Sequence, residues 1–433
     1  MRASGIGVAL LAFVSLLPSA PRAVADGVDG PSADEVRAAR DKGISFLKSR
    51  QDAEGSWGAV GGTSMYGGGG KASSAYAYPA GATALSLYAL LASGVPKDDP
   101  LVKKGFVFLD KQAKASGAPG SSYEASAMIL AVTARAPGPL AWHRGDAVKL
   151  AADDKKKVQA LVDALLAMRI SAKTSGWRYN TSFNSKPPGG NQDLSSTGLA
   201  TLALFAADRC GAKVPADLWS ELAAFAMAQQ EMTGDERERA VDEAPLEPPS
   251  AAAAPGSAPK PPSDAGPAKD RARGFAYIRS EALDPDEGQP TGGMTACGVS
   301  ILQSARLVLG KKNARGWGAK DQAGVRQSLL DGCAWLDANW SPSTNPRKKQ
   351  IDTYHVLYLT HLGDAMDLVG SPRLGAHPWF ADVARGLLQT QKPDGSWNTG
   401  SSHKPADVLD TCFALLFFAR PFGAPAPAAG AGK

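Results

Sequence analysis

Two segments near opposite ends of the chain repeat almost the same turn. Residues 51–57 read Gln-Asp-Ala-Glu-Gly-Ser-Trp, and residues 391–397 read Gln-Lys-Pro-Asp-Gly-Ser-Trp. A degenerate relative, Gly-Trp-Arg-Tyr, stands at residues 176–179. Turns that recur at equivalent places in successive units indicate a repeat architecture. This feature limits the possible folds more than any other in the sequence.

Each turn joins two helical segments of different character. The segment before a turn is amphipathic, as in residues 155–168, where apolar side chains recur with a helical period. The segment after a turn starts with small residues and is apolar on nearly every face, as in residues 195–204 and 410–416. Because a helix that is apolar all round is buried all round, the pattern predicts an exposed layer around a buried one.

Pairing each amphipathic segment with the buried segment that follows it gives six helix pairs. They lie at residues 34–95, 100–136, 153–209, 216–310, 323–370 and 378–421. This arrangement predicts an all-α fold, an (α/α)6 toroid with two concentric rings of helices. The competing architecture is an open solenoid. The near-identity of the first and last turns favours a closed ring in which the two ends meet.

The segments outside the helix pairs divide the chain further. Residues 1–25 have the order of a secretory signal peptide, with a basic start, an apolar run and small residues up to Ala25. We therefore expect a secreted or periplasmic protein with one toroid domain at residues 26–421. The Pro- and Ala-rich residues 243–270 are too poor in apolar side chains to fold, and we expect a disordered insertion there and a flexible tail at 422–433.

The charge and hydropathy of the sequence exclude nucleic acid as a partner and a membrane span after the leader. The chain carries 47 basic and 42 acidic residues, and removing Arg2 and Arg22 with the leader leaves a net charge of +3. No basic cluster alternates with aromatic residues, so nucleic-acid binding is not expected. No segment after the leader is long and apolar enough to span a membrane.

The cysteines lie in apolar helical stretches and are expected to be buried free thiols: Cys210, Cys297, Cys333 and Cys412.

The two Gln-to-Trp turns resemble the QW repeats of squalene-hopene and oxidosqualene cyclases. In that family the glutamine and tryptophan side chains tie the outer helices together around an (α/α)6 barrel. The resemblance covers most of residues 34–421 and implies the toroid of the terpene-cyclase and protein-prenyltransferase superfamily. The layout is also similar to that of exported bacterial proteins with prenyltransferase and squalene oxidase repeats. It implies a central cavity for an apolar or elongated ligand, and no cofactor.

The proton-donating Asp-x-Asp-Asp-Thr-Ala motif of those cyclases is missing. Proton donation of this kind needs clustered carboxylates whose repulsion raises one pKa. The nearest strings supply the catalytic candidates Asp284, Asp286, Glu287 and Asp410. The alternative for the first three is a solvated loop whose charges favour the start of a helix. Catalysis is therefore doubtful, and whether the protein is an enzyme stays open.

Three residues invite a comparison with the zinc site of protein prenyltransferases. In that family an Asp-x-Cys string and an Asp-x-Tyr-His string supply the ligands, and here Asp331, Cys333 and His355 have matching types. Asp331 and Cys333, however, fall on an expected outer helix, whereas the ligands of the family come from inner helices. We therefore expect no metal, with a buried cysteine and a hydrogen-bonded histidine instead.

Aromatic and polar residues gather near the expected starts of the inner helices. Rings at such places could stabilise a cation, stack on a sugar or simply pack, and Asp193 could equally cap its helix. The candidates for ligand binding are Trp177, Tyr179, Asp193, Tyr277, Tyr354 and His355.

Three functional hypotheses follow from these observations. The first is an exported toroid that binds an apolar or elongated small molecule in its central cavity. The second is an enzyme of the terpene-cyclase or prenyltransferase type. The third is an extracytoplasmic carbohydrate-active toroid, because polysaccharide lyases and glycosidases also use α/α barrels.

Overall fold

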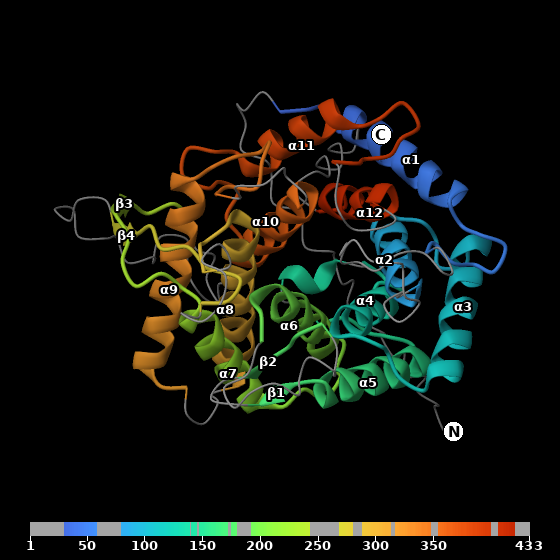
Figure 1. Cartoon of the computed structure of the whole chain (residues 1–433), viewed down its shortest axis with the longest axis horizontal. Helices are drawn as coiled ribbons and strands as arrows, with labels where there is room; N and C mark the ends of the chain where they lie inside the picture. The colour runs from blue at the N-terminus through green and yellow to red at the C-terminus, as the bar shows by residue number, and fades with distance from the viewer. Residues whose placement is uncertain are drawn as a thin grey trace, which may run out of the picture.

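The computed structural model describes residues 30–58, 79–138, 140–144, 147–171, 175–179, 192–242, 268–279, 288–312, 317–347, 354–399 and 406–420. Within these residues twelve α-helices alternate between two concentric rings (Figure 1). The outer ring contains α1 (Ala33–Ser49), α3 (Pro100–Ser116), α5 (Ala152–Ala167), α7 (Ala216–Ala228), α9 (Ala319–Ala338) and α11 (Trp379–Thr390). The inner ring contains α2 (Pro79–Ala92), α4 (Ser122–Thr133), α6 (Leu194–Arg209), α8 (Gly292–Lys312), α10 (His355–Val369) and α12 (Ala406–Phe418).

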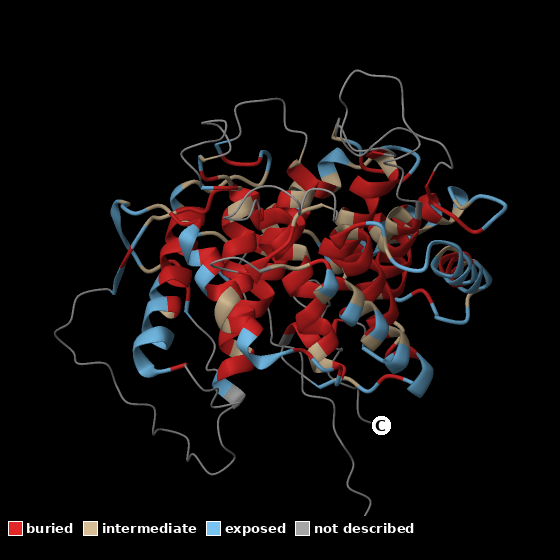
Figure 2. Cartoon of the chain, turned by 60° about the horizontal axis from the view of Figure 1, so that its bottom comes forward, coloured by how far each residue is buried: buried red, intermediate tan, exposed pale blue. Residues whose placement is uncertain are grey.

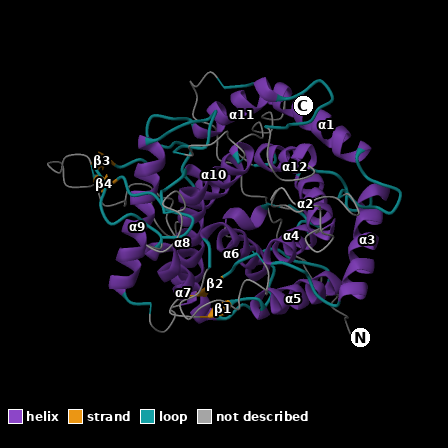
Figure 3. Ribbon diagram, viewed as in Figure 1, coloured by secondary structure: helices purple, strands orange, loops and turns teal. Residues whose placement is uncertain are grey.

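The inner ring is closed. Each inner helix contacts the next one along the chain, and α12 contacts α2. In the outer ring, α11 contacts α1, and Figure 3 shows the helices forming a continuous annulus. The predicted (α/α)6 toroid is therefore confirmed, and the open solenoid is excluded.

Burial separates the two rings as the sequence pattern predicts. In the inner helix α4 every residue except Tyr123 is buried, whereas in the outer helix α11 the buried side chains Val383, Ala384 and Leu387 form one stripe. Figure 2 shows the same contrast across the molecule, with exposed residues on the outer helices and buried residues between the rings. Small residues bring inner helices close together, since a Cβ atom at Gly198 would lie 3.0 Å from Cys297 on α8.

The repeated turns are the corners that join an outer helix to the next inner helix. In the last one, the Trp397 indole nitrogen donates to the Leu387 carbonyl at 2.8 Å, and the Trp397 backbone N–H donates to Thr411 Oγ1 at 3.0 Å. Corresponding bonds join Trp57 to Leu47 and Thr83, and Trp177 to Leu165 and Thr197. The degenerate third copy is therefore a true corner, and it follows a small antiparallel sheet of β1 (Ile170–Ser171) and β2 (Ser175–Gly176).

The glutamines of these corners connect one outer helix to the next. Gln51 Nε2, at the end of α1, donates to the Leu101 carbonyl of α3 at 2.9 Å. Gln391 Nε2, at the end of α11, donates to the Ala39 carbonyl of α1 at 2.8 Å. The last corner is thus bound to the first outer helix, α1, in the same way that the first corner is bound to the second outer helix, α3.

A fourth corner has the same construction but is divided by an insertion. Gln230 Nε2, after α7, donates to the Ser328 carbonyl of α9 at 2.8 Å. Phe275 replaces the tryptophan, and its backbone N–H donates to Thr295 Oγ1 at 3.1 Å. This corner cannot be recognised in the sequence because the two halves of the turn are far apart in the chain.

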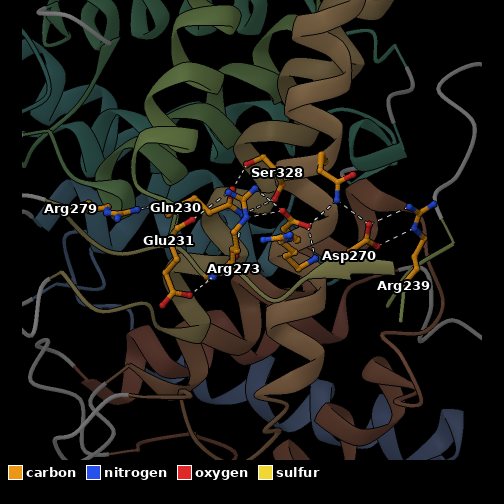
Figure 4. Close-up of polar contacts among 11 residues, drawn as sticks. Gln230, Glu231, Arg239, Asp270, Arg273, Arg279 and Ser328 are labelled. Atoms are coloured by element: carbon orange, nitrogen blue, oxygen red, sulfur yellow. Dashed lines mark hydrogen bonds and ion pairs between the residues drawn. The ribbon is translucent and has the colours of Figure 1, made fainter. Parts of the chain in front are cut away.

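The insertion is anchored to the outer face of α9. Its strands β3 (Glu236–Glu238) and β4 (Lys269–Arg271) pair antiparallel. Asp270 is buried between the guanidinium of Arg239, 3.0 Å away, and Gln327 of α9, which donates at 3.1 Å. Figure 4 shows these contacts beside those of Gln230 and Ser328. The predicted disordered insertion is therefore wrong at its C-terminal end, because residues 269 and 270 belong to β4.

Several predictions fall outside the described residues. They concern the signal peptide at 1–25, residues 243–267 of the insertion, the tail at 422–433 and the acidic residues of the 280–287 segment. All four cysteines are buried and free: Cys210, Cys297, Cys333 and Cys412. None of the helices in the described part is long and apolar enough to cross a bilayer.

Candidate functional site

Backbone hydrogen bonds tie the starts of neighbouring inner helices to the corner segments, as at Ser122, Leu194 and Gly292. We call the face of the toroid where these helix starts and corners lie the N-terminal face. Asp193 caps α6 there, as the capping alternative predicts. Its Oδ1 accepts the Ser196 backbone N–H at 2.6 Å, and its Oδ2 accepts the Ser196 hydroxyl at 2.8 Å. The side chain is 0% exposed, so the carboxyl group lies beneath the surface of this face.

Three tyrosines surround Asp193, and each is partly exposed. Tyr123, in the first turn of α4, hydrogen-bonds to the Ser195 hydroxyl at 2.6 Å, and its ring stacks on that of Tyr179 with centroids 6.0 Å apart. The hydroxyl groups of Tyr179 and Tyr277 hydrogen-bond to each other, and Tyr277 also hydrogen-bonds to Asp193. We refer to Tyr123, Tyr179, Tyr277, Arg178 and Asp193 together as the tyrosine cluster.

Arg178 is the cation of this cluster. Its guanidinium group lies 4.8 Å from the ring centroid of Tyr179 and 5.3 Å from that of Tyr277. Its Nη1 lies 3.6 Å from Asp193 Oδ2. The positive charge is therefore engaged by two aromatic faces and one carboxylate of the same chain.

The backbone holds the cluster rigidly in place. The Ser122 N–H donates to the Tyr179 carbonyl at 2.9 Å, and the Leu194 N–H donates to the Tyr277 carbonyl at 3.0 Å. The corner that contains Tyr179 is thereby attached to α4, and the segment that contains Tyr277 is attached to α6. Three separate parts of the chain thus meet at adjoining helix starts.

Burial dominates the electrostatics of Asp193. Removal from water raises the pKa of Asp193 to about 6, although the Arg178 charge and the hydrogen bonds from Ser196 and Tyr277 oppose the rise. A carboxyl group with a pKa near neutrality can exchange a proton at physiological pH. The Asp193 side chain is 0% exposed, whereas Arg178 and the three tyrosines are partly exposed.

A second polar cluster lies near the opposite ends of the inner helices. The 3₁₀ helix η2 (Ala141–Arg144) contacts both α6 and α10, and its His143 side chain is 1% exposed. His143 lies 3.7 Å from Asp364 and 3.4 Å from Asp367, both on α10. Arg420, just after α12, pairs with both aspartates, with Nε 3.2 Å from Asp367. This buried ionic cluster joins α10, the end of α12 and η2.

The structure places the predicted ligand-binding residues in three environments. Tyr179, Asp193 and Tyr277 meet in the tyrosine cluster. Trp177 lies outside this cluster: it is fully buried and its indole donates to the Leu165 carbonyl, as the packing alternative predicts. Tyr354 and His355 lie at the start of α10, where His355 Nε2 hydrogen-bonds to the Pro342 carbonyl at 3.1 Å.

Of the four catalytic candidates, the structure describes Asp410. Asp410 is on α12, opposite α6 in the inner ring, and its Oδ2 accepts the Thr399 backbone N–H at 2.9 Å and its hydroxyl at 3.0 Å. Burial raises the pKa of Asp410. Asp284, Asp286 and Glu287 lie outside the described residues.

The zinc candidates are engaged elsewhere. Asp331 lies on the outer helix α9, as predicted, where its carboxylate accepts the Arg271 backbone N–H at 2.8 Å and pairs with Arg273. Cys333 is buried on the same helix. Among the residues that the structure describes, no group of histidine, cysteine and acidic side chains is arranged to hold a metal ion.

Sequence reasoning missed part of both clusters. Tyr123 lies in no motif, and Arg178, although it belongs to the degenerate turn at 176–179, is not among the predicted ligand-binding residues. A signal did exist for the ionic cluster, because Asp364 and Asp367 interrupt the apolar inner helix α10 with a spacing that puts both on one face.

Comparison with known proteins supports the fold alone. No protein-family model matches the chain, and no curated protein matches its sequence. An inactive variant of the α-1,6-mannanase GH76A from Salegentibacter sp. HEL1_6, in complex with α-1,6-mannotetrose, is similar with a TM-score of 0.50 and 9% identity. That alignment covers 90% of this chain and 99% of the mannanase.

Two further structures are similar at lower scores. The type II terpene cyclase MstE from Scytonema has a TM-score of 0.48 and 12% identity, with 90% of this chain and 98% of the cyclase covered. A family 76 glycoside hydrolase from a bovine Bacteroides thetaiotaomicron strain has a TM-score of 0.45 and 10% identity, with 89% and 77% covered. By its own closed rings and by its likeness to the mannanase, the chain is an α/α toroid.

Proposed function

We propose that this protein is an exported toroid that binds an elongated ligand at its N-terminal face, and that the tyrosine cluster is the contact surface. The observation that carries the proposal is the set of partly exposed side chains of Tyr123, Tyr179 and Tyr277 around the partly exposed Arg178 and its buried partner Asp193. Tyrosine offers a large rigid surface with a polar edge, at a small cost in conformational entropy. The corner resemblance to squalene cyclases and the mannotetrose bound by the mannanase agree with an elongated ligand.

The positions of the acidic side chains Asp193 and Asp410 favour ligand binding without turnover. Asp193 is enclosed by its own helix start and by the cluster, and Asp410 is on the opposite inner helix. Asp410 is engaged by Thr399 and Asp193 by Ser196, so each carboxyl group is held by its own segment of the chain. The motif with which squalene cyclases donate a proton is also missing from the sequence.

The second candidate function is acid catalysis by Asp193. It is favoured by one observation, the rise of the pKa of Asp193 to about 6 through burial. The variant Asp193→Asn separates the two functions, because asparagine also caps a helix start. In this variant the affinity for the ligand is kept in both cases. An acid catalyst also loses its turnover, whereas a binding protein has no turnover to lose.

The binding proposal is tested by a thermal-shift screen of the purified full-length chain. Neutral and anionic oligosaccharides, squalene and farnesyl diphosphate serve as probes, and Tyr179→Ala serves as the variant. We expect at least one probe to raise the melting temperature of the wild type and to lose this effect in Tyr179→Ala. If no probe stabilises the wild type, or if the variant responds equally, the tyrosine cluster is not a binding surface.

A further inference from the structure

We infer that η2 is a latch on the inner ring, which the positive charge of His143 holds closed and which opens when His143 loses its proton. The latch lies near the ends of the inner helices, whereas the tyrosine cluster lies at their starts. It therefore goes beyond the proposed binding function and does not depend on it. Three features of the molecule carry the inference: the position of η2, the charges of the ionic cluster and the geometry of the His143 contacts.

η2 bridges two inner helices that are not neighbours in the ring. It contacts α6 and α10, which are separated by α8. Trp142 of η2 is fully buried, and its ring meets that of Phe205 on α6 edge-on, with centroids 6.2 Å apart. On the other side, His143 reaches Asp364 of α10. Burial and, after it, the charge of Asp364 raise the pKa of Tyr88 on α2. Because α12 separates α10 from α2 in the ring, Asp364 lies on the inner side of α10, and η2 closes over the interior of the ring.

The charges of the ionic cluster balance when His143 is positive. With both carboxyl groups ionised, Asp364 and Asp367 bring two negative charges and Arg420 brings one positive charge. An imidazolium group at His143 supplies the second positive charge. None of the four side chains is more than 7% exposed. Because an unbalanced charge is costly to bury, the closed position of η2 favours the charged form of His143.

Charge attraction, and not hydrogen bonding, attaches His143 to α10. Its Nε2 lies 3.7 Å from Asp364 Oδ1, and its Nδ1 lies 3.4 Å from Asp367 Oδ2. Within the described residues, neither nitrogen of His143 and neither carboxylate oxygen of Asp367 has a hydrogen-bond partner. A hydrogen-bonded imidazole keeps one N–H donor when it becomes neutral, whereas an attraction between charges disappears with the charge. Loss of the proton therefore detaches His143 and leaves a net negative charge buried beneath η2.

The other titratable groups around the cluster do not supply this response. Burial and the nearby carboxylate charge raise the pKa of the Tyr88 phenol and of the Cys297 thiol on α8, so both groups stay neutral. Burial lowers the pKa of His361 on α10, which also favours its neutral form. Charged side chains on the adjoining turns of α6 and α8 have partners on their own helices: Asp208 with Arg209, and Arg306 with Gln303. Imidazole is the side-chain group that changes charge between about pH 5 and 8, so His143 is the group that responds.

Amide hydrogen exchange of the purified full-length chain, measured by mass spectrometry, tests the inference. The readout is the exchange rate of peptides that cover residues 140–144, corrected for the intrinsic pH dependence of amide exchange. The amide of His143 is suited to this readout, because it donates to the Leu140 carbonyl at 3.1 Å. We expect the corrected rate in the wild type to rise at least about tenfold between about pH 5.5 and about pH 8. Peptides from α4 and α6 should show no such rise, because only η2 opens.

Three variants identify the group that responds to pH. His143→Gln cannot carry a charge, so η2 should exchange fast at every pH. Asp367→Asn removes one negative charge and leaves Asp364 balanced by Arg420, so a charge on His143 is no longer needed and the pH response should disappear. His361→Gln is the matched control, since it removes the other buried histidine near the cluster and should keep the pH response.

The outcomes decide as follows. A pH response in the wild type and in His361→Gln that is absent in His143→Gln and Asp367→Asn supports the latch. A wild-type rate that does not change with pH, or a response that persists in His143→Gln, overturns it. If circular dichroism shows that His143→Gln does not fold, the comparison of the wild type with Asp367→Asn decides, and an unchanged response in Asp367→Asn overturns the latch.

Discussion

Closure of the outer ring can be tested with two matched glutamine variants. Gln391 Nε2 donates to the Ala39 carbonyl at 2.8 Å and to the Gly395 carbonyl at 3.0 Å. Gln51 Nε2 makes the equivalent bonds to Leu101 at 2.9 Å and to Gly55 at 3.1 Å. The bond from Gln391 to Ala39 joins the two ends of the chain, and the bond from Gln51 to Leu101 joins successive outer helices.

Each glutamine-to-alanine change removes two hydrogen bonds. A typical bond contributes about 1 kcal/mol net, so Gln391→Ala and Gln51→Ala should each lower the free energy of unfolding by about 2 kcal/mol. The measurement is urea-induced unfolding followed by circular dichroism, with the midpoint and the slope compared among the two variants and the wild type. In a closed ring the two losses are similar because the two corners are alike.

An open array gives a different result. There Gln391 would have no first helix to bind, and Gln391→Ala would lose only the local bond to Gly395. A Gln391→Ala variant as stable as the wild type, beside a Gln51→Ala variant that loses about 2 kcal/mol, would refute the closed toroid. The tyrosine cluster would lose its structural basis with it, because its three segments meet only when the inner ring is assembled.

Three further predictions concern buried charge and a close backbone approach. Burial raises the pKa of Asp193 from 3.8 to about 6. The protonated carboxyl group therefore contributes its full stability below pH ~4, and this contribution is lost as the pH rises through about 6. Asp193→Asn should remove this pH dependence, so that the free energy of unfolding changes by about 3 kcal/mol less between pH ~4 and ~7 than in the wild type. Arg420→Met removes the guanidinium group from buried Asp364 and Asp367 and should cost about 3–5 kcal/mol in urea unfolding. A loss below ~1 kcal/mol would contradict the ionic cluster. Gly94→Ala, at φ +90 with nothing within 4 Å, should cost about 1–2 kcal/mol, and Gly55→Ala should cost more, since its Cβ would lie 2.6 Å from the Lys104 carbonyl.

The sequence predicted the helical framework because that framework depends on local pattern. Apolar residues all around a segment require an inner helix, and a one-sided stripe requires an outer helix. The corners were readable wherever glutamine, glycine and tryptophan stand close together, as at 51–57 and 391–397. The fourth corner was not, because an insertion separates Gln230 from Phe275 and because phenylalanine replaces tryptophan.

The candidate site depended on contacts between distant segments. Tyr179, Asp193 and Tyr277 could be named from the sequence as residues near helix starts, but their common location could not. Asp193 bonds to Tyr277 from the fourth helix pair, and Tyr123 from the second pair bonds to Ser195 beside it. Sequence spacing carries no information about such contacts, since they form only when neighbouring pairs pack side by side.

The sequence by itself determined that the chain forms two layers of paired helices and that its ends share one kind of corner. Only the tertiary structure decided that Trp177 packs inside the wall while Tyr179, two residues later, reaches the N-terminal face. It also decided that Arg178 is balanced by Asp193. The physical reason is that burial and pairing of a side chain depend on which surfaces close over it, and here those surfaces come from helices that only ring closure brings together.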